Sequence, residues 1–185
     1  MTMITSGLTG LFASYMVSTE KLDILKDPNF VAPCDINPFL SCGTVMRSIY
    51  STQIMFGYPN SWLGLMMYPC AIWLGLFLIF AKDHNKTFLR FCNIFPFFAF
   101  LLSCYWLYLQ GYVIRAICIW CLLSAISSTL IFYSTTKYNI LIDNPPLPFL
   151  KGLKKWVKRD WDAPFVILWF IGVFLFLAIP FWLGF

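Results

Sequence analysis

The sequence predicts an all-α integral membrane protein with five transmembrane helices. Hydrophobic residues make up 60% of the 185 residues and charged residues only 11%, whereas a soluble globular domain carries about 25% charged residues. The mean hydropathy is +0.75, and the apolar residues stand in runs close to the roughly 20 residues that span a bilayer. Too little polar surface remains to cover a water-soluble globule.

We expect the transmembrane helices at about residues 3–18, 62–81, 88–109, 117–136 and 164–185. The second, third and fifth are continuous apolar runs, and the fourth is interrupted only by hydroxyl residues and cysteines. The first apolar run, Met3–Val17, is too short for a hydrocarbon core of about 30 Å at roughly 1.5 Å per residue. This helix is therefore expected to take in following residues or to thin the bilayer locally.

Basic residues predict the side of the membrane on which each connection lies. Lys82, Lys86 and Arg90 follow the second helix, and the connection 137–163 is richer still in lysine. Because short basic loops stay in the cytoplasm, we expect the N-terminus inside, and the loop 19–61, the connection around Arg115 and the C-terminus outside. The segment 149–161 has the pattern of an interfacial helix on the cytoplasmic leaflet. This topology accounts for the net charge of +5, so nucleic-acid binding is not expected.

Two cysteine pairs are predicted to meet on the outer side of the membrane. Cys34 and Cys42 close a short polar loop, and Cys118 and Cys121 form the motif CIWC at the outer end of the fourth helix. Disulfides form and persist in that oxidising compartment. A Cys-x-x-Cys motif at a helix N-terminus has both sulfurs on one face, where the helix dipole stabilises a thiolate. The two pairs together favour a relay by thiol–disulfide exchange.

The same residues also allow plainer interpretations. Taken alone, the pair of Cys34 and Cys42 is best interpreted as a structural staple. Taken alone, CIWC indicates redox chemistry, with half of a zinc site or two buried thiols as the alternatives. Zinc needs four ligands, and the only histidine, His84, lies in a cytoplasmic connection. A soft-metal carrier would need further ligands along a path through the membrane. The remaining cysteines stand alone in apolar segments and are expected to pack as small hydrophobic side chains: Cys70, Cys92 and Cys104.

A relay needs a final electron acceptor, and a CxxC motif inside a membrane suggests a lipid-soluble one. The segment after Cys42 has apolar residues at helical spacing that predict an amphipathic segment on the membrane surface, able to roof an apolar pocket: Val45, Met46, Ile49 and Tyr50. The sequence GYPNS at 57–61 predicts a turn before the next helix, with Asn60 in the region of its N-cap.

In combination, these motifs resemble the vitamin K epoxide reductase family. The resemblance rests on Cys-x7-Cys, on Ser48 six residues later, on FGYPNSWLG entering a helix and on CIWC beginning another. It implies a four-helix core over 1–136 that surrounds a quinone and is capped by an outer loop with a half-helix. The basic connection 137–163 and the fifth helix 164–185 follow this core.

The resemblance implies a role for each relay cysteine. Cys34 would meet a partner, Cys42 would relay to Cys118, and Cys121 would face the quinone. The expected activity is that of a bacterial inner-membrane oxidoreductase that reoxidises a thioredoxin-fold protein in the periplasm and reduces a quinone. Many bacterial members carry a fused thioredoxin-like domain after the fifth helix, so the partner of this chain is expected to be a separate protein.

The resemblance also bears on the quinone site. Asn60 matches the family's asparagine that donates to a quinone carbonyl, and Ser48 matches its loop serine. From the residues alone, helix capping for Asn60 and a solvated helix face for Ser48 are the simpler interpretations. Ala125 stands where the vertebrate enzymes have a quinone-binding tyrosine. This difference favours ubiquinone or menaquinone as the acceptor and leaves vitamin K quinone or epoxide reduction as the alternative.

Overall fold

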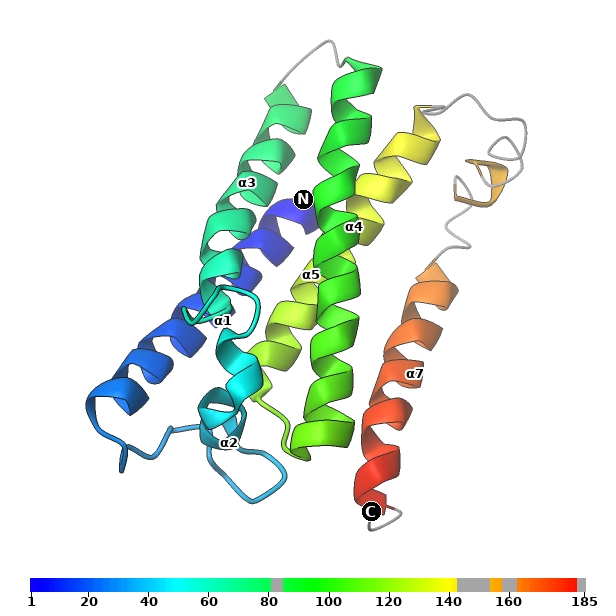
Figure 1. Cartoon of the computed structure of the whole chain (residues 1–185). Helices are drawn as coiled ribbons and strands as arrows, with labels where there is room; N and C mark the ends of the chain where they lie inside the picture. The colour runs from blue at the N-terminus through cyan, green and yellow to red at the C-terminus, as the bar shows by residue number, and fades with distance from the viewer. Residues whose placement is uncertain (81–84, 143–153, 158–162, 183–185) are drawn as a thin grey trace.

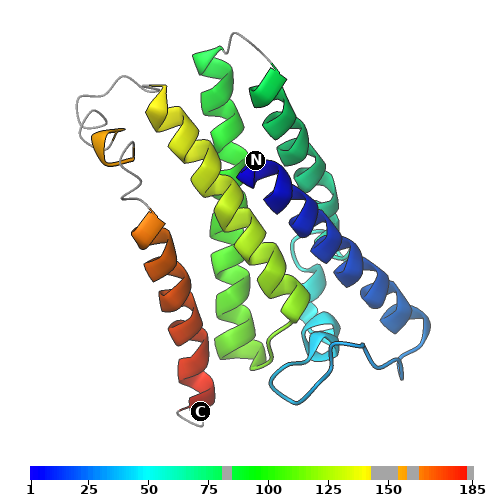
Figure 2. The ribbon, with the colours of Figure 1, turned by 180° about the vertical axis from the view of Figure 1, so that it is seen from behind.

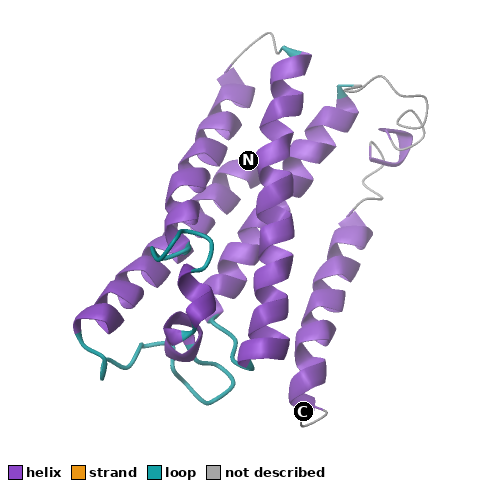
Figure 3. Cartoon of the chain, viewed as in Figure 1, coloured by secondary structure: helices purple, strands orange, loops and turns teal. Residues whose placement is uncertain are grey.

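The structure is a computed structural model that describes residues 1–80, 85–142, 154–157 and 163–182. Over these residues the chain is helical and contains no strand (Figure 3), so the expected all-α membrane protein is confirmed. Three helices are long and apolar enough to cross a membrane. They are α3 (Ser61–Phe80), α5 (Ile119–Leu141), and α4 (Lys86–Tyr108) continued by the π-helical turn η2 (Leu109–Ile114).

Two more long helices pack beside these three (Figures 1 and 2). Helix α1 (Thr2–Lys26) packs along α3 and α5, and α4 packs on the other side of α5. Helix α7 (Ala163–Trp182) contacts η2 at the edge of this four-helix bundle, and its apolar part, Pro164–Pro180, is shorter than the three candidate spans. Residues 154–157 are helical, and the rest of the interfacial helix expected over 149–161 lies outside the described residues.

The first helix takes in the residues that follow its short apolar run, since it ends at Lys26 and not near residue 18. The polar residues after the apolar run continue the helix because their side chains find partners on its buried face. Ser18 Oγ shares a hydrogen bond of 2.8 Å with Ser61 Oγ of α3. Lys21 Nζ donates to Ser51 Oγ at 2.9 Å. The expected outer loop therefore begins about two turns later than predicted.

Glycines allow α1 and α3 to cross closely. A Cβ atom added at Gly10 would lie 2.3 Å from the ring of Tyr68, and one at Gly64 would lie 2.1 Å from a side-chain oxygen of α1. Small residues at such contacts let helix backbones approach each other within a membrane. The hydroxyl of Tyr68 then reaches α5, where it lies 2.9 Å from the carbonyl oxygen of Ser124 and 2.9 Å from Ser128 Oγ. This one side chain ties three helices together.

The chain between α1 and α3 folds back onto one end of the bundle as two short helices, α2 (Cys42–Arg47) and η1 (Ile49–Thr52) (Figure 1). Two backbone hydrogen bonds attach it to the segment before α5. Ile117 N–H donates to Phe39 O at 2.7 Å, and Ser41 N–H donates to Ile117 O at 3.1 Å. The start of α2 is thereby held beside the start of α5. We call residues 27–52 and 109–121 the cysteine end of the bundle.

The sequence predicted one continuous amphipathic segment after Cys42. This prediction is wrong for the second half of the segment. Val45 and Met46 are buried, whereas Ile49 is 79% exposed. The reason is that Ser48 leaves the helical conformation, with φ −63° and ψ 148°. The backbone turns at this residue, so the side chains after it no longer continue the apolar face of α2.

Candidate active site

All four cysteines of the two predicted pairs lie together at the cysteine end. Cys34 and Cys42 form a disulfide with their Cα atoms 5.7 Å apart, and Cys118 and Cys121 carry free thiols. Cys34, Cys42 and Cys118 are buried in one apolar cluster, and Cys121 packs against it. The bridge between the two chain segments explains this proximity, because Cys42 and Cys118 directly follow the hydrogen-bonded residues Ser41 and Ile117.

Side chains within the loop fix the conformation of the first pair. Asp35 Oδ1 accepts hydrogen bonds from Gly43 N–H at 2.8 Å and from Ser41 Oγ at 3.0 Å. Asn37 Oδ1 accepts from the backbone N–H groups of the two residues before Ser41, at 2.9 and 2.8 Å. A Cβ atom at Gly43 would lie 2.4 Å from the Asp35 carboxylate. Glycine therefore allows the carboxylate to cap the start of α2.

Cys118 is the N-cap of α5, which begins at Ile119. Its sulfur accepts a hydrogen bond from Cys121 N–H at 3.4 Å, and its own N–H donates to Gln110 Oε1 at 2.9 Å. The sulfur of Cys118 therefore lies against the free backbone N–H groups at the start of α5. CIWC thus has the local geometry of a reactive dithiol.

A buried carboxylate links the two pairs. Glu20 is 4% exposed; its Oε1 accepts from Trp120 Nε1–H at 3.1 Å, and its Oε2 lies 3.3 Å from Cys34 Sγ. Glu20 lies in the last turns of α1, beyond the predicted membrane span. Burial raises the pKa of Glu20 above its usual value; the hydrogen bond from Trp120 opposes this rise, and the negative charges of Asp35 and Asp23 add to it.

Lys21 turns away from this carboxylate. Its ammonium group donates to Met46 O and to Ser51 Oγ. Burial lowers the pKa of Lys21 below its usual value, and the positive charge of Arg47 adds to this effect. Sequence reasoning missed Glu20 and Lys21 because charged residues after an apolar run are typical of a loop.

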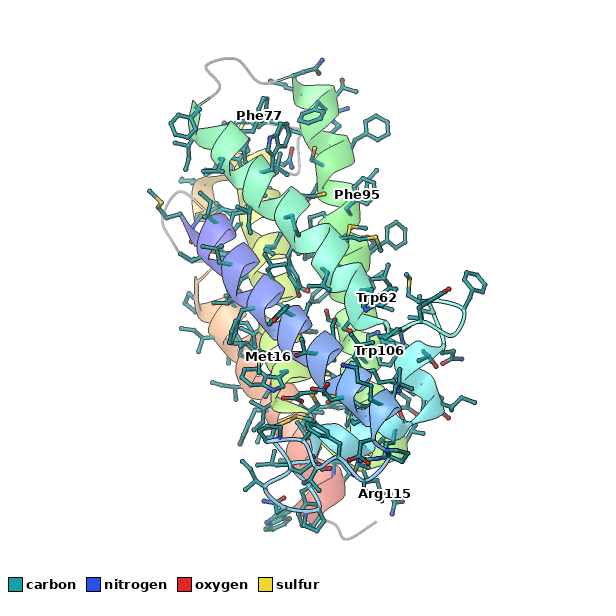
Figure 4. All side chains as sticks on the ribbon, turned by 90° about the vertical axis from the view of Figure 1, so that its left-hand side faces the viewer. Met16, Trp62, Phe77, Phe95, Trp106 and Arg115 are labelled. Atoms are coloured by element: carbon teal, nitrogen blue, oxygen red, sulfur yellow. A yellow bond between two sulfur atoms is a disulfide. The ribbon has the colours of Figure 1, made fainter. Side chains whose placement is uncertain are left out.

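An apolar cavity of about 270 Å³ opens beside Cys121, between α1, α3, α4 and α5. Lys21 and Ser51 line it at the cysteine end, and Ala125 lines it on α5. Figure 4 shows two aromatic residues of its lining, Phe95 and Trp106, at different heights along α4. The cavity therefore extends from the second cysteine pair into the apolar interior of the bundle.

Asn60 lines this cavity but does not cap α3 as the sequence suggested. Its Oδ1 accepts from the N–H groups of Ile54 and Met55 at 3.1 and 3.2 Å, and its Nδ2 donates to Tyr50 O at 2.7 Å. The side chain thus holds the loop between η1 and α3, a contact that its position before a helix does not reveal. Nδ2 carries two hydrogens, so the second can be donated into the cavity.

Gln110 is a cavity residue that the sequence did not indicate. It is 1% exposed and lines the cavity from η2, while its Oε1 is used by Cys118 N–H. Over the described residues its Nε2 has no acceptor. A buried donor of this kind calls for a partner. Ser48, in contrast, donates to Val45 O at 2.7 Å and is not among the residues that line the cavity; its neighbour Ser51 is.

The described residues also hold one group of possible metal ligands, formed by Glu20, Cys34 and Cys42 with their ligand atoms within 4.8 Å of one another. The disulfide uses both sulfurs, so in this state the group offers a single carboxylate. The other cysteines are separate from it. Cys70 is exposed, and Cys92 and Cys104 are half-buried in the helices.

The chain matches a known protein family. The family model described as the vitamin K epoxide reductase family matches residues 1–136. This range contains both cysteine pairs, Asn60, Glu20 and the cavity residues named above. No curated protein matches the chain.

Proposed function

We propose, from the premise that this chain belongs to the vitamin K epoxide reductase family, that it is a membrane oxidoreductase passing electrons from a soluble dithiol protein to a quinone. Membership of the family makes it a membrane thiol–disulfide oxidoreductase, and the electron donor and acceptor are our proposal. The observation that carries it is the single cluster of four relay cysteines, in which Cys121 opens onto an apolar cavity.

The relay moves two electrons through two exchanges. A thiolate of the partner attacks Cys34 and releases Cys42; the partner's second cysteine then frees Cys34 and closes the partner's disulfide. With CIWC oxidised, Cys42 attacks Cys118 and releases Cys121. Cys34 then attacks Cys42 and releases Cys118. The outer pair is again a disulfide and CIWC is a dithiol, which is the combination of states present in the structure.

A quinone bound in the cavity would take up the two electrons and two protons that the CIWC dithiol gives up when it becomes a disulfide. The cavity residues fit such a group, because a mostly apolar pocket with a few polar atoms is typical of small-molecule sites. The second Nδ2 hydrogen of Asn60 and the Nε2 group of Gln110 would donate to carbonyl oxygens. Cys121 would lie at the reacting end. Ala125 leaves room where a tyrosine would stand, which supports a plain quinone, ubiquinone or menaquinone, over an epoxide.

We place the cysteine end outside the cytoplasm, in the periplasm if the source is bacterial. Helix α4 begins with the basic residues Lys86 and Arg90, and its start lies at the opposite end of the bundle from the start of α5 (Figure 1). Basic residues favour the cytoplasmic side. The disulfide of Cys34 and Cys42 supports the same orientation, since disulfides persist outside the cytoplasm. A thioredoxin-fold protein on that side of the membrane is the partner that this orientation favours.

Replacing Cys42 by serine is expected to trap the partner on Cys34. In the variant the free thiol of Cys34 attacks the disulfide of the oxidised partner, and Cys42 can no longer resolve the mixed disulfide from within the chain. Re-attack by the partner's second cysteine is then the one route by which the mixed disulfide decays, so it accumulates relative to the parent. Non-reducing gels with mass mapping of the cross-linked peptides measure it. The matched control is Cys70→Ser, which should show no adduct. An adduct that survives the further change Cys34→Ser and sits on Cys118 would show that the relay order is wrong.

Replacing Asn60 by aspartate is expected to lower quinone reduction about 10- to 100-fold per folded molecule. The aspartate keeps the acceptor for Ile54 and Met55 but removes the donor, and a hydrogen bond to developing charge contributes about 1.5–3 kcal/mol. Turnover and thermal stability are measured together, because the bond to Tyr50 is also lost and costs about 0.5–1.5 kcal/mol of stability. Unchanged turnover with lowered stability would make Asn60 a structural residue only.

A further inference from the structure

Glu20 is a buried acid for which the relay described above has no role. Burying a carboxylate is costly unless it is paired or hydrogen-bonded, and over the described residues no cation pairs with Glu20. The neighbouring Lys21 directs its ammonium group to Met46 and Ser51 instead. One carboxylate oxygen accepts from Trp120, and the other faces Cys34 Sγ at 3.3 Å. The carboxylate therefore touches an atom that forms and breaks bonds in the relay.

The contact between Glu20 and Cys34 depends on the redox state. In the disulfide, Cys34 Sγ carries no hydrogen, so Oε2 of Glu20 receives nothing from it. In the dithiol, the same sulfur has a proton to donate across the same distance. A hydrogen bond to the ionised form of an acid favours ionisation. Glu20 is therefore more readily protonated beside the disulfide and more readily ionised beside the thiol.

We propose that Glu20 is the proton carrier of Cys34, taking the thiol proton when Cys34 attacks and returning it when Cys34 leaves. This rests on the proposed relay. In the inward step, the Glu20 carboxylate accepts the proton of the Cys34 thiol. The Cys34 sulfur then bonds to Cys42, the bond between Cys42 and Cys118 breaks, and Cys118 departs as a thiolate. In the outward step, Cys34 is released from the partner as a thiolate and regains the proton from Glu20.

The groups around Glu20 suit this role. Asp35 and Asp23 face it with negative charge, and Trp120 contacts it from α5, between the two cysteines of CIWC. The charge of Glu20 also interacts with Cys121. The raised pKa of Glu20 brings the acid closer to the pKa of a thiol, which makes proton transfer between them easier. The position of Glu20 and its raised pKa thus both suit proton exchange with Cys34, the relay cysteine whose sulfur it contacts.

The test is the pH dependence of the midpoint potential of the pair formed by Cys34 and Cys42. The full-length chain in lipid nanodiscs carries Cys118→Ala and Cys121→Ala, and it is equilibrated with glutathione redox buffers from about pH 5 to 8. Reduction of a disulfide to two thiols takes up two protons for two electrons. If Glu20 supplies one of them, the slope of potential against pH falls from the two-proton value toward the one-proton value, in a window above the usual carboxyl pKa.

Three variants give the test its controls. Glu20→Gln keeps an oxygen for Trp120 but cannot carry the proton, so the two-proton slope should hold throughout. Asp27→Asn changes an exposed acid at the C-cap of the same helix and should leave the region of lowered slope where it is in the parent. Trp120→Phe removes a donor that lowers the pKa of Glu20, so the region should move to higher pH.

An unbroken two-proton slope in the parent overturns the proposal, as does a lowered slope that persists in Glu20→Gln. If Glu20→Gln does not fold, Trp120→Phe provides the test. The proposal is overturned if the pH region of lowered slope stays in the same place in that variant. Neither quinone nor partner takes part in this measurement. Its failure is therefore distinct from failure of the proposed relay.

Discussion

Replacing Cys121 by serine is expected to lower quinone reduction by about 10³-fold or more, as removal of a catalytic nucleophile commonly does. Among the described residues, Cys121 is the one cysteine that lines the cavity beside the CIWC motif. The serine hydroxyl keeps nearly the same volume but cannot form a disulfide with Cys118, so electrons have no path from the relay to the acceptor. Quinol formation under anaerobic conditions, with reduced dithiol as donor, measures the loss.

The matched control for this variant is Cys70→Ser. Cys70 is exposed on α3, and its sulfur donates to Met66 O at 3.4 Å, a bond that a serine hydroxyl can replace. Its rate should equal that of the parent, and the Cys92→Ser variant should behave in the same way. Parent-like quinone reduction in Cys121→Ser would remove CIWC from the electron path.

Replacing Gly10 by valine is expected to destabilise the bundle by about 1–3 kcal/mol or more, the usual cost of overpacking. The new Cβ atom would meet the ring of Tyr68 at 2.3 Å, and the ring is held by its hydroxyl contacts to Ser124 and Ser128. The ring can yield only by leaving α5 and disturbing the cavity that it lines. Both thermal stability and quinone turnover should fall.

Gly172→Val in α7 is the control for Gly10→Val. A Cβ atom at Gly172 meets no heavy atom within 4 Å, so valine should change stability little and leave turnover intact. Thermal unfolding followed by the exposure of cysteines to a thiol-reactive dye measures both variants. If Gly10→Val melted at the same temperature as Gly172→Val, the close crossing of α1 and α3 would be contradicted.

The sequence predicted the all-α membrane architecture and the meeting of the two cysteine pairs at one end of the bundle, because the signals for the helices and for each pair are local. A run of about 20 apolar residues needs a bilayer whatever its neighbours are, and CIWC carries its helix-start geometry within four residues. The end of α1 had no such signal. Glu20 and Lys21 stay helical through partners that are distant in the chain, such as Trp120, which is 100 residues away from Glu20. Such long-range partners cannot be derived from a single segment.

The structure of residues 48–60 also depends on contacts that the local sequence pattern does not reveal. The pattern before α3 is typical of a helix cap, yet the amide of Asn60 hydrogen-bonds the loop that precedes it, at Ile54, Met55 and Tyr50. Helical spacing past Ser48 suggested one apolar face, but the backbone turns there. Gln110 gave no signal, since a glutamine near the end of an apolar run is as readily a surface residue. Gln110 matters because its Oε1 accepts a hydrogen bond from the N–H of Cys118.

The central claim is that electrons reach quinone through CIWC, and that the pair of Cys34 and Cys42 is then oxidised by CIWC. Fully reduced protein in nanodiscs is mixed with quinone without oxygen, thiols are blocked at successive times, and disulfides are mapped by mass spectrometry. We predict that the disulfide of Cys118 and Cys121 appears first, with one quinol formed for each disulfide, and that the disulfide of Cys34 and Cys42 forms afterwards at its expense. Formation of the Cys34–Cys42 disulfide with its quinol before any disulfide at CIWC would contradict the account.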